Sequence, residues 1–121
     1  MTCADFKNGT FVFPTTELMT YSYTIIREGN TQIEISRDSK DPLNKDLNKT
    51  SYGIVEWIND CTYRVKYDET KMELDEYGKF INENNGIMTE IIRIEDNCFY
   101  FKTTFVIEGV IQNREGKLCA K

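Results

Sequence analysis

Two acidic residues are the side chains of this sequence most suited to holding a polar group inside a folded domain. Glu56 and Glu90 occupy polar positions on predicted strand faces that are otherwise apolar. A carboxylate buried on such a face needs a hydrogen-bonding partner, and burial raises its pKa. Glu56 is predicted to lie opposite Tyr63, where it would hold the polar end of a bound molecule. The alternatives are that the predicted face is the wrong one, or that each carboxylate lies at a strand end near water.

Aromatic residues follow the same predicted faces and would line an apolar cavity. They are Tyr52, Tyr63, Tyr67, Phe99, Phe101 and Phe105. Ordinary core packing is the commoner use of such residues. The predicted ligand-contacting set is therefore Glu56 together with Tyr52, Tyr63, Tyr67, Phe99 and Phe101.

The sequence favours binding over catalysis, because it contains no His. That removes the commonest general base and the commonest zinc ligand, and leaves Ser and Cys without a base to activate them. No glycine-rich phosphate loop and no calcium loop is present. The acidic residues between positions 68 and 76 fit the start of a helix better than a metal site. We therefore expect no enzymatic activity, no cofactor and no metal.

Length and charge restrict the partners of the chain. Its 121 residues correspond to one domain, spanning 1–121, that is large enough to bury a core. The net charge of −5 makes nucleic acid and anionic membrane surfaces poor partners. No apolar run approaches the roughly 20 residues of a membrane helix. The expected partner is a small apolar ligand, and the sequence does not identify a protein partner.

The clearest strand alternation lies in the stretch from Ser51 to Tyr67, which reads as two strands joined at Asn59-Asp60. A two-residue turn there pairs Ile58 with Cys61, Glu56 with Tyr63, Ile54 with Val65 and Tyr52 with Tyr67, and places all eight on one face. The alternative is a bulge at Asp60, which would shift the register by one residue and exchange the faces of one strand.

Two further hairpins are predicted on either side of this stretch. The first joins residues 21–28 to 31–37 at Gly29-Asn30, and it pairs Ile26 with Ile33 and Thr24 with Ile35. Its second face carries Tyr21, Tyr23 and Ile25 opposite Glu34 and Gln32, so both faces hold large side chains. The second hairpin joins residues 87–95 to 98–107 at Asp96-Asn97, and it pairs Ile94 with Phe99, Arg93 with Tyr100, Ile92 with Phe101 and Glu90 with Thr103.

Short strands at residues 9–13 and 109–114 and one helix within Thr70–Asn84 complete the predicted elements. Thr70 and Glu73 have capping-box spacing, and Asn84-Asn85-Gly86 supplies a helix stop. Sequential hairpins at regular spacing indicate a mainly β fold. We predict an antiparallel up-and-down meander of about eight strands, closed or nearly closed into a lipocalin-like barrel with one short helix.

The four cysteines, Cys3, Cys61, Cys98 and Cys119, permit two disulfides in three possible pairings. Reversal of direction at each strand places all four at the same end of the meander. A direct bridge between Cys61 and Cys98 would span two strand spacings, which exceeds the Cα separation of a disulfide. We favour a bridge from Cys119 to Cys3 or Cys98. The alternative is four free thiols in a reducing compartment.

Several segments of the first half of the chain form a recognisable pattern: Asp5-Phe6-Lys7, Ile26-Arg27, Gln32-Ile33-Glu34 and, most specifically, the segment from Trp57 through Asp60-Cys61 to Tyr67. In these segments the chain resembles a family of small exported lipoproteins from Bacteroidetes. The resemblance implies a lipocalin-like barrel in the cell envelope without an established activity. Members often carry the label of a DNA topoisomerase IV subunit, which a short acidic chain without the expected catalytic motifs does not support.

The resemblance also implies an exported location, periplasmic or anchored in the outer membrane. In such precursors a Cys at the start of the mature chain is acylated, and Cys3 is placed for that modification, which would compete with a disulfide at the same sulfur. The predicted function is binding of a small apolar or amphipathic ligand by an envelope-associated barrel. The alternative is a structural or protein-interaction module with a filled core.

Overall fold

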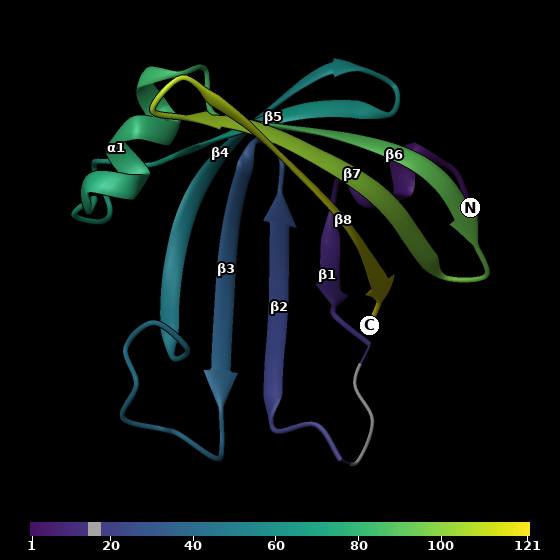
Figure 1. The fold of residues 1–121 in the computed structure, drawn as a ribbon. Helices are drawn as coiled ribbons and strands as arrows, with labels where there is room; N and C mark the ends of the chain where they lie inside the picture. The colour runs from purple at the N-terminus through teal and green to yellow at the C-terminus, as the bar shows by residue number, and fades with distance from the viewer. Residues whose placement is uncertain (15–17) are drawn as a thin grey trace.

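The computed structural model describes residues 1–14 and 18–121, and within them the chain forms a closed barrel. Eight antiparallel strands follow one another in chain order, so the predicted up-and-down barrel is confirmed (Figure 1). They are β1 (Gly9–Val12), β2 (Tyr21–Glu28), β3 (Thr31–Asp38), β4 (Lys49–Asn59), β5 (Thr62–Tyr67), β6 (Ile87–Glu95), β7 (Cys98–Ile107) and β8 (Val110–Ala120). A 3₁₀ turn, η1 (Cys3–Phe6), and a helix, α1 (Glu76–Glu83), lie on opposite sides of the barrel (Figure 1).

The hairpin of β2 and β3 has the predicted register. Ile26 lies opposite Ile33, and Thr24 lies opposite Ile35. Gly29 has a φ of 61°, which suits the first central position of a two-residue hairpin turn. The pairing sends these aliphatic side chains to the outer surface, and it places the mixed polar and aromatic face of the hairpin inside the barrel.

The hairpin of β4 and β5 corrects the predicted register. The structure pairs Asn59 with Thr62 across a turn at Asp60-Cys61, and the register shifts between Trp57 and Asn59. Val55 then lies opposite Val65, and Trp57 lies opposite Tyr63. The one-residue shift exchanges the faces of β4, because side chains alternate along a strand. It buries Val55, Tyr63 and Val65 together, whereas the predicted pairing would have buried Glu56.

The hairpin of β6 and β7 has the predicted register only near its turn. Ile94 lies opposite Phe99 and Arg93 opposite Tyr100, as predicted. A shift between Ile91 and Arg93 then pairs Ile91 with Phe101, Glu90 with Lys102 and Thr89 with Thr103. The predicted pairs of Ile92 with Phe101 and Glu90 with Thr103 are therefore wrong. Glu90 is exposed on the outer surface instead of facing the core.

Two elements differ in length from their prediction. The last strand continues to Ala120 and pairs with β7 along its whole length. The helix is shorter than predicted and begins after Asp75, whose carboxylate accepts a hydrogen bond of 2.7 Å from the Gly78 amide. Thr70, the predicted cap, donates to Asp68 in a turn that precedes the helix. Among the described residues, no helix is long and apolar enough to cross a membrane.

Aromatic packing closes the end of the barrel that η1 covers. Phe6 is fully buried, and its ring centroid lies 4.5 Å from that of Phe11 and 4.4 Å from that of Phe99. Ile25, Ile91 and Leu118 complete this cluster. We call this region the closed end.

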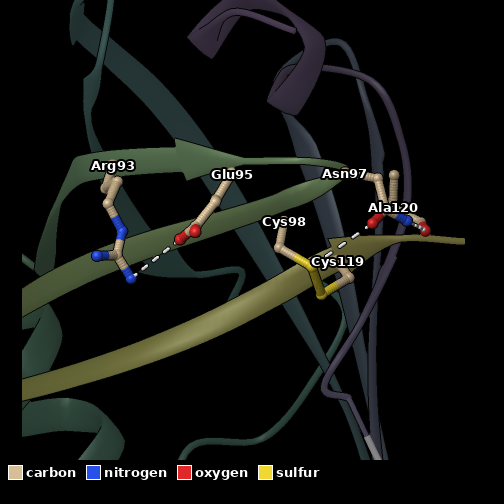
Figure 2. The surroundings of a disulfide bond; sticks show 6 residues. All are labelled: Arg93, Glu95, Asn97, Cys98, Cys119 and Ala120. Atoms are coloured by element: carbon tan, nitrogen blue, oxygen red, sulfur yellow. Dashed lines mark hydrogen bonds and ion pairs between the residues drawn. A yellow bond between two sulfur atoms is a disulfide. The ribbon is translucent and has the colours of Figure 1, made fainter.

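Both disulfides lie at the closed end, as the predicted strand directions require. They join Cys3 to Cys61 and Cys98 to Cys119, and the second pair spans directly opposite positions of β7 and β8 (Figure 2). Asn97 supports the second bridge, since its side-chain amide donates a 3.0 Å hydrogen bond to the Ala120 carbonyl (Figure 2). Sequence separations of 58 and 21 residues correspond to about 4 and about 3 kcal/mol of stabilisation in the chain-entropy account of disulfides.

The pairing decides between the alternatives for the cysteines. The favoured bridge between Cys119 and Cys98 is present, and the bridge between Cys119 and Cys3 is not. The predicted acylation of Cys3 is wrong for this structure, because its sulfur is bonded to that of Cys61. Disulfides persist in oxidising compartments, so two of them are consistent with an exported protein.

Candidate functional site

A cavity of about 180 Å³ lies inside the barrel, next to the closed end. Six strands contribute to its wall, through Tyr23, Ile25, Arg27, Gln32, Glu34, Tyr63, Val65, Tyr67, Ile87, Thr89, Phe101, Thr103 and Leu118. An engineered apolar cavity of about 150 Å³ holds benzene, so this one accommodates a molecule of comparable size. Its wall combines an apolar lining with a small number of polar groups, which is the usual composition of a ligand site.

Arg27 forms the floor of the cavity and is only 3% exposed. Its Nε donates a 2.8 Å hydrogen bond to the Gln32 side chain, and its Nη1 donates one of 3.1 Å to the Phe6 carbonyl. The guanidinium carbon lies 4.4 Å from the ring centroid of Phe6 and 4.2 Å from that of Tyr63. Cation–π contacts with two rings and two hydrogen bonds therefore fix the position of this cation inside the barrel.

Glu34 and Tyr23 form the second polar group of the cavity. They project inward from β3 and β2, and the Tyr23 hydroxyl donates a hydrogen bond to the Glu34 carboxylate. Burial raises the pKa of Glu34, which the hydrogen bond from Tyr23 and the charge of Arg27 only partly offset. Burial and the neighbouring Glu34 also raise the pKa of Tyr23 well above its usual value. Glu34 is thus an acid that the barrel holds closer to its neutral form.

Tyr67 marks the way into the cavity. It borders the cavity itself, an adjoining hollow of about 140 Å³ and an outer depression of about 500 Å³. The hollow shares Tyr23 and Glu34 with the cavity, and it shares Lys49 and Ser51 with the depression. The depression lies between the segment before β4 and the start of α1. These shared walls trace a route from the surface beside α1, past Tyr67, to Arg27.

Three residues of the predicted ligand-contacting set lie on the cavity wall: Tyr63, Tyr67 and Phe101. The ring of Phe101 packs over Gly116 of β8, where a Cβ atom would lie 2.6 Å from the ring. The absence of a side chain at Gly116 therefore allows this aromatic residue to form part of the wall.

The other three residues of the set lie elsewhere. Glu56 is on the outer surface, where its carboxylate forms a salt bridge of 2.7 Å with Arg64. Its predicted inward position is therefore wrong. Tyr52 belongs to the same outward face of β4 and lies opposite Ile33. Phe99 is fully buried in the aromatic cluster of the closed end and does not border the cavity. Phe105 contacts Tyr77 of α1.

The sequence interpretation missed the polar residues that distinguish the site: Tyr23, Arg27, Gln32 and Glu34. The sequence feature that could have found them is the second face of the β2–β3 hairpin, which carries large polar and aromatic side chains. The aliphatic side chains of the hairpin lie on its other face. The correct register of this hairpin placed them on one face. The sequence does not show which of the two faces points inward, because the aliphatic face is equally suited to a core. Only the closed barrel shows it.

The fold and the site define a class of protein: a small disulfide-bonded, up-and-down β-barrel with an internal cavity that opens at one end. Comparison with protein-family models, with curated proteins and with solved structures finds no match to this chain. The functional argument therefore depends on the geometry of the cavity.

Proposed function

We propose that the protein binds a small apolar or amphipathic ligand inside its barrel. The observation that carries this proposal is the cavity of about 180 Å³, which has an apolar wall, a few convergent polar groups and a route to the surface. Packed cores contain few voids larger than a water molecule, so a space of this size in a domain of 121 residues needs an explanation. Binding a ligand provides one.

We propose that this binding takes place in the cell envelope, on the periplasmic side. The involvement of all four cysteines in disulfides supports an oxidising compartment. The resemblance of the first half of the chain to exported Bacteroidetes lipoproteins agrees with this location. A lipid attached through the sulfur of Cys3 is not part of the proposal, because the disulfide uses that sulfur.

The first test compares the native mass of the purified protein with its denatured, non-reduced mass. A copurified ligand adds mass in the native spectrum that is lost on denaturation. The second test soaks the protein with 1-hexanol and benzene and follows amide chemical shifts by NMR. Shifts at Tyr63, Thr89 and Phe101 support the proposal. A bare native mass together with an unshifted spectrum at millimolar probe concentrations would refute it.

A pair of variants at neighbouring positions separates the cavity from the surface. Thr103 faces the cavity, where its hydroxyl lies 3.3 Å from that of Thr89. Thr104 is the next residue and faces outward, where it donates to Asn113. Thr103→Phe fills the cavity and should abolish probe binding. Thr104→Phe makes the same chemical change on the outer surface and should leave binding unchanged. Equal effects of the two variants would contradict binding inside the barrel.

A protein-interaction module is the second candidate, and the β7–β8 hairpin favours it. Val110 and Ile111 are 57% and 64% exposed at its tip. Among the described residues, β8 pairs with β1 only through Cys119 and Ala120, so its outer edge is open from 110 to 117. Open strand edges accept strands of other chains. Under this function Val110→Lys would abolish partner capture, and Thr103→Phe would leave it unchanged.

A further inference from the structure

We propose that the ligand is a small monocarboxylic acid whose carboxylate binds to Arg27 at the floor of the cavity. This inference depends on the proposed function, since it assigns the chemical class of the molecule that enters the barrel. It arises from the unusual position of Arg27, a cation enclosed within the barrel of an acidic protein.

The hydrogen bonds of Arg27 leave part of its guanidinium free. Nε and Nη1 donate to Gln32 and Phe6, whereas Nη2 has no hydrogen-bond partner among the described residues. The two salt bridges between described residues join Arg64 to Glu56 and Arg93 to Glu95, so neither involves Arg27. A buried cation without a paired anion is unfavourable. A carboxylate in the cavity would supply the missing anion and accept from Nη2, since guanidinium and carboxylate geometries match.

Glu34 forms no salt bridge with Arg27 among the described residues. It takes its hydrogen bond from Tyr23, and burial holds it closer to its neutral form by raising its pKa. The other charged group near the cavity is Lys49 of β4, which borders the adjoining hollow and is also positive. The lining residues of β5, β6, β7 and β8 carry only hydroxyl or apolar side chains. Arg27 and Lys49 are therefore the cationic donors beside this space, and among the described residues neither forms a salt bridge with Glu34.

The shape of the site determines how the acid enters. Arg27 contacts Phe6 of the closed end, whereas Tyr67 lies where the cavity meets the outer hollows. The carboxylate therefore enters first, and the hydrocarbon tail contacts Val65, Ile87 and Phe101 behind it. A space of about 180 Å³ is comparable to one that holds the six carbons of benzene, which corresponds to a short aliphatic or single-ring acid.

Three probes with six-carbon chains test the charge of the head group on the unmodified, oxidised protein. They are hexanoate, hexanamide and hexylammonium, titrated by NMR at neutral pH. Hexanoate should bind roughly tenfold or more tightly than hexanamide. The reason is that a hydrogen bond between charged groups contributes more free energy than one between neutral groups. Equal binding of hexanoate and hexanamide would overturn the carboxylate and leave the proposed function standing. Preference for hexylammonium would also overturn it, and would indicate Glu34 as the anchor. Binding of none of the three would refute both proposals.

A matched pair of variants assigns the effect to Arg27. Arg27→Met should remove the preference for hexanoate while hexanamide still binds. Arg93→Met removes an arginine that is exposed on the outer surface and stacked on Tyr100, and it should retain the preference. A preserved preference in folded Arg27→Met would overturn the assignment. If that variant does not fold, Arg27→Lys keeps the positive charge and should retain part of the preference, and its loss of all preference for the anion would count against the proposal.

Discussion

The two halves of the barrel interior are built from different side chains. The closed end contains the rings of Phe6, Phe11 and Phe99 under η1, and both disulfides. The half toward α1 contains the cavity, a buried acid and a tyrosine hydroxyl, and neither disulfide reaches it. Arg27 lies at the boundary, since it stacks on Phe6 and faces the cavity.

This difference teaches how a small domain can keep an internal space. A cavity and buried polar groups both oppose folding, because they forgo packing and require desolvation. Close aromatic packing stabilises the folded state at the opposite end, and the two disulfides there restrict the unfolded chain. We infer that the closed end supplies the stability and that the cavity half supplies the recognition.

The largest expected effect comes from removing an aromatic ring at the closed end. Phe6→Ala should lower the free energy of unfolding by about 3–5 kcal/mol, as for other fully buried Phe residues. The ring also covers Phe11, Phe99 and the guanidinium of Arg27. Urea denaturation of the oxidised protein measures this change.

Phe101→Ala is the matched control, because it removes the same ring at the cavity wall. Phe101 already borders empty space and is only partly buried, so its loss creates less new cavity. Its cost should be the smaller of the two. A greater loss for Phe101→Ala than for Phe6→Ala would reverse the assignment of stability to the closed end.

A second, intermediate effect is the pH dependence of stability that Glu34 produces. Burial raises its pKa in the folded state above the ordinary 4.5, so the folded protein holds this proton more tightly than the unfolded chain does. Its contribution to stability is fully present below the unfolded pKa and decreases as the pH rises through the folded pKa. Asp38 and Asp68, whose pKa values are lowered by hydrogen bonds from neighbouring residues, act with the opposite sign.

Urea denaturation of wild type and Glu34→Gln across the pH range isolates the contribution of Glu34 to the pH dependence of stability. The amide cannot ionise, so the variant should gain stability relative to wild type as the pH rises above 4.5. Asp38→Asn serves as the control, because the lowered pKa of Asp38 confines its effect to the acid side of the ordinary 3.8. This variant should lose stability relative to wild type as the pH rises toward 3.8 and should show a constant difference above it. A constant difference between wild type and Glu34→Gln would show that Glu34 does not titrate inside the barrel.

Strand order, closure and the end of the barrel that holds the cysteines could be predicted from the sequence. Turn residues fix hairpins locally, and the direction of each strand then follows from the count of turns. The register of β2 and β3 was predicted for the same reason, since the turn at Gly29 has two residues and no bulge follows it.

The sequence could not indicate the faces of β4 or the far part of β6, because bulges intervene. A bulge adds one unpaired residue without any strong residue preference, and it reverses every face beyond it. The shift near Ile58 moved Glu56 outward, and the shift near Ile92 did the same to Glu90. Tyr63 and Tyr67 of β5 were still predicted correctly as cavity residues. The register shift changes which side chains of β4 point inward, but not which side chains of β5 do.

The smallest expected effect tests this correction of register. Glu56→Gln should change the free energy of unfolding by less than about 1 kcal/mol, because exposed salt bridges contribute little. The Glu56 side chain is 65% exposed, and its partner Arg64 keeps contact with solvent. In the predicted inward position, the same change would have replaced a buried carboxylate and altered both stability and its pH dependence, as Glu34→Gln is expected to do. Denaturation of Glu56→Gln and Glu34→Gln over one pH series therefore compares an outer with an inner carboxylate. A gain in stability of Glu56→Gln with rising pH, of the kind expected for Glu34→Gln, would place Glu56 inside the barrel after all.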